Sequence, residues 1–190
     1  MTISGKTWLV LNQASGSYDE EREALLLEGL ERAGRKPDRI VDCSSDHLPD
    51  AATLDNAGVG FLVVHGGDGT LNSAIGRLDG WAGTVLALPG GTANLLCKML
   101  YGEAEIDAIL DALAAEQLSP TRRPCVKGKG WLALAEVLAG PGANWADVRE
   151  EMREGNIVKV VAGAFDAASA STVGPMVALE TPELGRPEGY

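Results

Sequence analysis

The sequence predicts an α/β protein with a doubly wound, mainly parallel sheet, followed by a short second part that we expect to be β-rich and incomplete. Strand-like and helix-like segments alternate through the first two-thirds of the chain, which indicates βαβ units. Residues 59–64 and 84–88 are continuous apolar runs, typical of strands buried on both faces of a parallel sheet. Each of these two runs leads directly into a glycine-rich loop and then into a helix-like segment.

The other elements of the first part follow from the same patterns. Asp19 can cap a helix, and Gly34 suits the end of that helix. Elsewhere, apolar residues recur at helical spacing or in short β-branched runs between turn signals. We expect strands at residues 8–11, 39–43, 59–64 and 84–88, and helices at residues 20–33, 51–56, 71–78, 95–99 and 103–116.

The character of the sequence changes after Leu118. Residues 119–130 contain two prolines, two glycines and four basic residues, which predicts a linker or a crossover connection. For its basic residues, Arg122, Arg123, Lys127 and Lys129, we favour a solvated linker over the alternative of a local membrane-binding patch. Beyond the linker we expect strands at residues 131–138 and 176–180, and helices at residues 145–154 and 156–168.

The charge of the chain excludes one class of partner. Lys and Arg total 16 against 27 Asp and Glu, which gives a formal net charge of −11. Such a surface repels phosphates of nucleic acids, so we expect no nucleic acid partner.

Exposed strand edges in the shortened second part would favour self-association into a homo-oligomer.

Cysteine usage and apolar length indicate the compartment. Cys43, Cys97 and Cys125 are too far apart for a zinc-ligand motif, and their number is odd, which fits a reducing cytosol. We see no signal peptide, and the apolar stretches are shorter than a bilayer span. We therefore expect a cytoplasmic protein that is at most peripheral to a membrane.

The first glycine-rich loop, residues 66–70, reads Gly-Gly-Asp-Gly-Thr. Glycines leave no Cβ between backbone and ligand, so consecutive N–H groups can point at one anion. A helix beginning near Leu71 adds the positive end of its dipole, and Thr70 adds a hydroxyl. Asp68 would repel a phosphate unless a cation lies between them, and Mg²⁺ is the natural intermediary. The alternative is a tight turn in which Asp68 merely caps the helix.

A second loop repeats this design. Residues 90–94 read Gly-Gly-Thr-Ala-Asn and again connect an apolar run to a helix-like segment. The polar loop at residues 12–17 follows the first strand in the same way. Because ligands bind at the carboxyl ends of parallel strands, we expect the three loops to lie on one rim. Two glycine-rich loops on that rim predict a phosphate site.

Two familiar nucleotide motifs do not fit. Gly5-Lys6-Thr7 has the tail of a P-loop, but it lacks the earlier glycine and precedes a strand. The dinucleotide fingerprint fails around Gly67 and Gly69, because Asn72 stands where the last glycine is required.

At these loops the sequence resembles the diacylglycerol kinase catalytic domain family. Residues 63–72 resemble its Gly-Gly-Asp-Gly-Thr signature, and residues 89–94 resemble its second motif. Residues 12–16 resemble its first motif, with Gln13 where proline is usual. The family includes sphingosine kinases, bacterial lipid kinases and, more remotely, NAD kinases. The resemblance covers residues 7–118, and its second motif favours lipid kinases over NAD kinases.

The resemblance implies a site for ATP and Mg²⁺. Asp68 is the expected catalytic residue, which would organise Mg²⁺ directly or through water. Ser44 and Lys98 lie near positions where family members often carry nucleotide-contacting or basic residues. The residues expected at the ATP site are Asn12, Ser15, Gly16, Gly66, Gly67, Asp68, Gly69, Thr70, Asn72, Gly91, Thr92 and Asn94.

The resemblance also implies ATP-dependent phosphoryl transfer to the hydroxyl of a lipid alcohol, such as diacylglycerol, at a membrane surface. We expect a nucleotide-binding kinase domain at residues 1–118, and a linker with a partial acceptor-side domain at residues 119–190. No Asp-Gly-Glu stands where family members carry the aspartate thought to deprotonate the acceptor. The alternatives are therefore a non-catalytic nucleotide-binding module, a truncated kinase fragment or an NAD kinase.

Overall fold

The computed structural model describes residues 4–13, 18–129, 131–137, 177–178 and 188–189 of the chain. The chain divides into two compact units, Met1–Glu136 and Val137–Tyr190. The predictions for helices at residues 145–154 and 156–168 lie outside the described residues. In the second unit the described residues include a short antiparallel pair, β7 (Val177–Ala178) with β8 (Glu188–Gly189).

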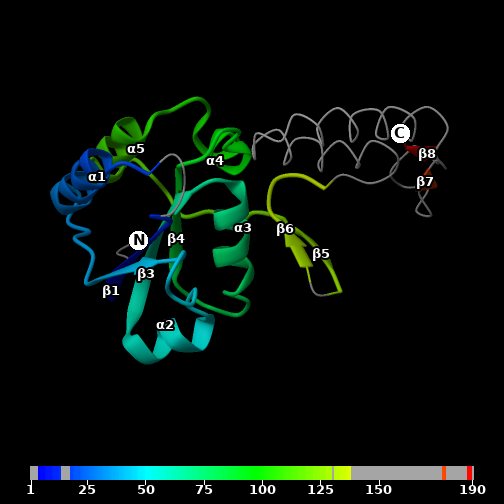
Figure 1. The fold of residues 1–190 in the computed structure, drawn as a ribbon, viewed down its shortest axis with the longest axis horizontal. Helices are drawn as coiled ribbons and strands as arrows, with labels where there is room; N and C mark the ends of the chain where they lie inside the picture. The colour runs from blue at the N-terminus through cyan, green and yellow to red at the C-terminus, as the bar shows by residue number, and fades with distance from the viewer. Residues whose placement is uncertain (1–3, 14–17, 130, 138–176, 179–187, 190) are drawn as a thin grey trace. The chain divides into compact units, whose positions relative to one another are not determined.

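The first unit is built on a four-stranded parallel sheet (Figure 1). The strand order is β2-β1-β3-β4, so the chain adds one strand to one side of β1 and then crosses to its other side. The sheet therefore reverses its direction of growth between β1 and β3. The strands are β1 (Lys6–Leu11), β2 (Arg39–Asp42), β3 (Val59–Gly66) and β4 (Thr84–Pro89).

Helices cover both faces of this sheet, which confirms the predicted doubly wound α/β class. Figure 1 shows α1 and α5 on one side of the sheet and α3 on the other. The hydrophobic clusters place α2 and α4 on the same side as α3. The helices are α1 (Glu20–Arg32), α2 (Ala51–Ala57), α3 (Asp68–Gly76), α4 (Leu95–Tyr101) and α5 (Ile106–Ala114).

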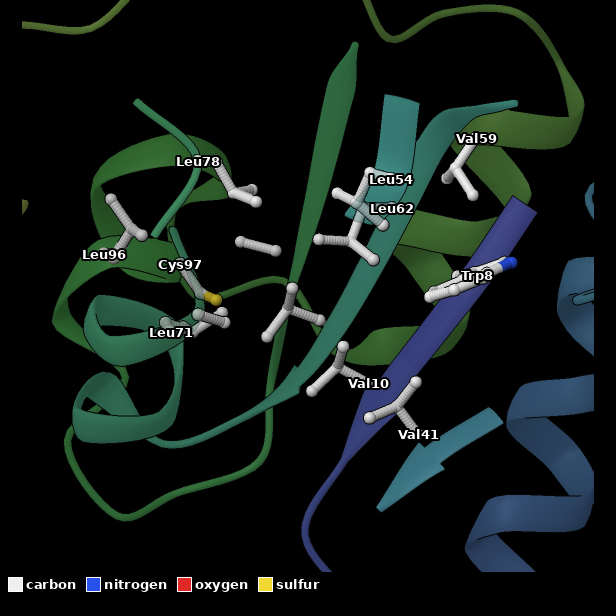
Figure 2. Packing of buried hydrophobic residues seen from close by; sticks show 13 residues of the cluster. Trp8, Val10, Val41, Leu54, Val59, Leu62, Leu71, Leu78, Leu96 and Cys97 are labelled. Carbon is white, nitrogen blue, oxygen red and sulfur yellow. The ribbon is translucent and has the colours of Figure 1, made fainter. Parts of the chain in front are cut away.

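Successive side chains of each strand point to opposite faces of the sheet and pack into two separate hydrophobic cores. On the α3 face, Val10 and Leu62 pack with Leu71 and Cys97, as Figure 2 shows. On the α1 face, Leu9 and Val63 pack with residues of α1 and α5, among them Leu30 and Leu110. Burial on both faces explains why β3 reads as one continuous apolar run.

Local signals explain where the first helices begin and end. Asp19 caps α1 as predicted, because its carboxylate accepts a hydrogen bond from Glu21 N. Gly34, with φ of 67°, lies just after α1 in the left-handed conformation that glycine tolerates. Helix α3 begins three residues before the predicted start at Leu71, since Gly67 already serves as its N-cap.

The linker prediction for residues 119–130 is wrong at its C-terminal end. Val126–Gly128 form β5, which pairs antiparallel with β6, Trp131–Ala133. This hairpin contacts α3, where Asn72 Nδ2 donates a 2.7 Å hydrogen bond to the Leu132 carbonyl. Strand β6 lies where a strand was predicted but is shorter than expected.

No helix among the described residues is long and apolar enough to cross a membrane.

Candidate functional site

A cavity of about 40 Å³ lies at the carboxyl end of the sheet, where β1 and β3 end side by side. Open α/β sheets bind ligands where the direction of growth reverses, and here that point lies between β1 and β3. A water molecule needs roughly 10–15 Å³ measured in this way, so the cavity has room for a group of phosphate size. Among the predicted site residues, it is lined by Asn12, Gly66, Gly67 and Thr70.

The two glycine-rich loops pack against each other backbone to backbone. Gly90 N donates a 3.0 Å hydrogen bond to the Gly66 carbonyl, and Gly90 also lines the cavity. A Cβ on Gly91 would lie 2.5 Å from Gly67 Cα, which is far inside van der Waals contact. Glycine is therefore required in these loops by their mutual contact.

Asn94 closes the second loop on itself. Its Oδ1 accepts a 2.8 Å hydrogen bond from Gly91 N, and its Nδ2 donates a 2.8 Å bond to the Gly91 carbonyl. Asn94 has a left-handed backbone (φ 51°, ψ 41°), which asparagine tolerates better than most residues. Asn94 thus fixes the shape of the turn that leads into α4.

Asp68 links the first loop to the second. Its two carboxylate oxygens accept 3.1 Å hydrogen bonds from Leu95 N and Leu96 N, the first two amides of α4. Asp68 therefore does not cap its own helix, the alternative to a phosphate loop, but caps the helix after the second loop. The N-cap residue of α4 itself, Asn94, makes no capping hydrogen bond with its side chain. Asp68 is half-buried, and its carboxylate fixes the first loop relative to α4.

The start of α3 is built differently, because no side chain caps it. Its N-cap is Gly67, and a Cβ on Gly69 would meet no atom within 4 Å. The first amides of an uncapped helix have no partner within the helix and lie at the positive end of its dipole. The start of α3, beside the cavity, therefore suits an anion.

Asp42, which the sequence analysis did not single out, ties the first loop to the loop after β2. Its carboxylate accepts hydrogen bonds from Gln13 N (3.1 Å), Ser44 N (3.0 Å) and Ser44 Oγ (2.6 Å). The hydrogen bond from the Ser44 hydroxyl is the largest cause that lowers the pKa of Asp42 to about 2. Ser44 therefore helps to hold the two loops together by donating hydrogen bonds to Asp42.

The α1 side of the cavity carries charges of both signs, from Asp19, Arg22 and Glu23. Glu23 accepts a 2.7 Å hydrogen bond from the Tyr18 hydroxyl and a 3.2 Å bond from Gln13 Nε2. The bond to Glu23 is the largest cause that raises the pKa of Tyr18 to about 12. Gln13, which stands where the resembling family has proline, is thus held by side chains of this wall. An anion in the cavity would be attracted to the start of α3 and to Arg22, and repelled by Asp19 and Glu23.

Sequence reasoning also missed His65, the residue before the first glycine loop. His65 is half-buried and lines the cavity, and its Nε2 lies 2.9 Å from the position that a Gly90 Cβ would take. Burial lowers the pKa of His65 below its usual value of 6.5, although its hydrogen bond with the Pro89 backbone acts in the opposite direction. The only sequence signal for a functional His65 was its place between the apolar run of β3 and the first glycine-rich loop.

The cavity is not lined by the other predicted residues that the structure describes, which are Asp68, Gly69, Asn72, Gly91, Thr92 and Asn94. The Asn72 side chain is bonded to the β6 backbone instead. Thr92 is exposed, and Lys98 forms an ion pair of 3.3 Å with Glu103. Ser15 and Gly16 lie outside the described residues. The part of the chain that the structure describes holds no cluster of three or more metal-ligating side chains.

The structure defines a doubly wound α/β domain with a cavity at the carboxyl end of its sheet, and comparison identifies its class. A family model, "Diacylglycerol kinase catalytic domain", matches residues 6–123. The chain therefore belongs to the diacylglycerol kinase catalytic domain family, as the motifs indicated.

Three individual proteins illustrate the degree of similarity to this chain. The chain is 30% identical over 116 residues to a protein named "Putative lipid kinase" of Streptococcus pneumoniae serotype 4 (strain ATCC BAA-334 / TIGR4). This match covers 57% of the chain but only 38% of that relative's length. Two solved structures of "a putative diacylglycerol kinase" from Bacillus anthracis str. Sterne are 23% identical, with TM-scores of 0.49 and 0.47. The two matches cover 61% and 58% of this chain, and each covers 41% of the solved chain.

Proposed function

We propose that this domain binds Mg²⁺ and ATP at the rim formed by the three loops and transfers the terminal phosphoryl group to the hydroxyl of a lipid alcohol. The observation that carries the proposal is the convergence of three strand-ending loops on one cavity between β1 and β3. Family membership supports a kinase reaction, and the similarity to a protein named "Putative lipid kinase" supports a lipid acceptor.

The residues at the start of α3 fit a phosphate. The uncapped amides of Gly69 and Thr70 would donate to phosphate oxygens, and the open space beside Gly69 would admit them closely. The Thr70 hydroxyl adds a donor in the cavity, and Asn12 lines its β1 side. The second loop contributes mainly by holding the first loop in place, through Gly90, Gly91 and Asp68.

One carboxylate at this rim fits a hydrated Mg²⁺. Each oxygen of Asp68 already accepts one backbone hydrogen bond, so its remaining lone pairs would reach the ion directly or through water. Mg²⁺ commonly keeps several waters and uses one or two carboxylates together with substrate phosphates. When bound, the ion neutralises charge on the transferring phosphoryl group.

The residues of this chain would act by positioning. In phosphoryl transfer the protein holds the phosphate chain and the acceptor in line and stabilises charge with fixed donors. The first loop, fixed to α4 by Asp68, supplies such donors without reorganisation. We further propose that residues 1–118 bind the nucleotide and residues 119–190 lie on the acceptor side, with the lipid presented at a membrane surface.

A transfer assay tests the proposed function. Purified chain would be incubated with Mg²⁺, radiolabelled ATP and phospholipid vesicles that contain diacylglycerol, with NAD as a separate acceptor. We expect label in the lipid product, no labelled NADP, and no transfer when EDTA is added. Labelled NADP would indicate the NAD kinase alternative instead.

Calorimetry separates binding from catalysis. ATP that binds without any transfer would overturn the enzyme proposal for this chain and support the non-catalytic module. ATP that does not bind at all would overturn the nucleotide site itself.

A further inference from the structure

His65 is a titratable side chain on the cavity wall that the proposed function does not use. It ends the apolar part of β3, directly before the first glycine-rich loop. It lines the cavity together with Thr70 and Gly90, and its Nε2 lies close to Gly90. A hydrogen bond connects its side chain to the Pro89 backbone, which leads into the second loop. His65 therefore contacts the second loop as well as the cavity.

The hydrogen-bonding capacity of a neutral imidazole is limited. The ring has one N–H donor and one acceptor nitrogen. The partner at Pro89 is necessarily the carbonyl, because proline has no N–H, so that bond uses the only donor of the neutral ring. The other nitrogen can accept but cannot donate, and an ionised phosphate offers only acceptors. A phosphate beside neutral His65 would therefore meet a lone pair.

Protonation removes this mismatch, because both nitrogens of an imidazolium donate. One N–H can keep the bond to the Pro89 carbonyl while the other donates to a phosphate oxygen. The charge would also attract the anion in a partly buried site. The N–H bond that forms takes its proton from solvent, and no other bond changes.

We propose that a phosphoryl group in the cavity binds together with a proton on His65, so that phosphate affinity and His65 protonation are linked. This inference rests on the proposed function, since it takes the phosphates of ATP as the ligand. The shared chemistry is a dianionic phosphoryl group, which ATP, ADP or inorganic phosphate can present.

The charged groups around His65 set the direction of this linkage. From α1, Glu23 favours the charged ring and Arg22 opposes it. Asp19 and Tyr18 also lie on the cavity wall, and the tyrosine remains neutral near pH 7. The adjoining turn after β4 brings only proline and glycine, Pro89 and Gly90. Without ligand, burial lowers the pKa of His65 and so favours the neutral ring. A bound dianion is the strongest added influence, and it acts to raise the pKa.

The most direct test follows the imidazole C–H signals of wild-type protein by NMR from pH 5 to 8. The chain has two histidines, and the second, His47, is exposed. We expect Mg·ATP and inorganic phosphate to move the His65 titration to higher pH and to leave that of His47 unchanged. Adenosine, which lacks phosphate, should move neither.

Calorimetry in two buffers of different ionisation enthalpy measures the same linkage as proton uptake. The nucleotide's terminal phosphate titrates near pH 6 itself, and the His65→Gln variant measures that contribution because its amide can still donate to Pro89. We expect wild type and the matched control His47→Gln to take up more protons than His65→Gln. Their affinity should also rise roughly threefold to tenfold between pH 8 and 6.5, within the tenfold per pH unit that one linked proton allows.

The outcomes are distinguishable. If Mg·ATP binds but the His65 titration does not move, the inference is overturned and the proposed function stands. Equal proton uptake by wild type and His65→Gln would also overturn the inference. If neither ATP nor phosphate binds, both the proposed nucleotide site and the inference are wrong.

Discussion

At the scale of single residues, glycine serves two purposes at this rim. Gly91 faces the backbone of Gly67, where no side chain can move aside to admit a methyl group. Gly69 faces open space and has an ordinary helical position in α3. The fold therefore requires glycine at position 91 but not at position 69, where we propose that the absence of a side chain lets a phosphate approach.

We expect Gly91→Ala to lower the free energy of unfolding by about 1–3 kcal/mol, because the loops must separate to admit the methyl group. Gly69→Ala should leave stability unchanged or raise it by up to about 1 kcal/mol, since alanine favours a helix. Urea denaturation of both variants checks the difference. A fully stable Gly91→Ala protein would contradict the packing of the two loops.

Asp68 combines a structural contact with a proposed metal role, and two variants separate them. Asp68→Ala removes both bonds to the start of α4 and should cost about 1–2 kcal/mol of stability. Asp68→Asn keeps one acceptor oxygen and should be destabilised less. Both variants should lose Mg²⁺-dependent transfer by at least about a hundredfold. If Asp68→Asn transfers phosphate at the wild-type rate, the carboxylate charge has no role in the reaction.

Asp42 predicts a pH dependence of stability. Its hydrogen bonds from Ser44 and Gln13 lower its pKa in the folded state to about 2, from an ordinary 3.8. The stabilisation is therefore fully present above about pH 4 and is lost as the pH falls toward 2. Thermal unfolding of wild type and Asp42→Asn should converge as the pH falls through this window. A constant difference between them from pH 5 to 2 would be inconsistent with these bonds.

At the scale of elements, the β5–β6 hairpin is bonded to α3 through Asn72, a residue that we predicted from the sequence to lie at the ATP site. Asn72 donates to the Leu132 carbonyl and does not line the cavity. This contact connects the helix that starts at the proposed phosphate site to the segment that leads into the second unit.

We therefore expect Asn72→Ala to lower stability by about 1 kcal/mol, the typical effect of losing one such hydrogen bond. ATP affinity should change less than twofold. The exposed neighbour Ser73 provides a matched control, since Ser73→Ala in the same helix should change neither quantity. A tenfold loss of ATP affinity in Asn72→Ala alone would show instead that Asn72 contacts the nucleotide.

At the scale of the whole molecule, the sequence predicted what depends on local patterns. The apolar runs of β3 and β4, the Asp19 cap and the alternation of strands with helices all follow from neighbours within a few residues. The rim as a whole was predictable because parallel strands must end at the same edge.

Long-range contacts could not be predicted in this way. The bond from Leu95 N to Asp68 spans 27 residues, and the bond from Asn72 to Leu132 spans 60. Nothing in the local sequence distinguishes a carboxylate that caps its own helix from one that caps another. Strand β5 was missed because three exposed residues, Val-Lys-Gly, carry no alternating pattern.

The central claim is that the loops after β1, β3 and β4 hold the phosphates of ATP between β1 and β3. The most direct measurement is an NMR titration of backbone amide shifts with Mg·ATP. We predict saturable changes that are largest at Asn12, at Gly67 to Thr70 and at Gly90, and a much weaker response to adenosine. Changes confined to residues away from this rim, or no saturable change, would contradict it.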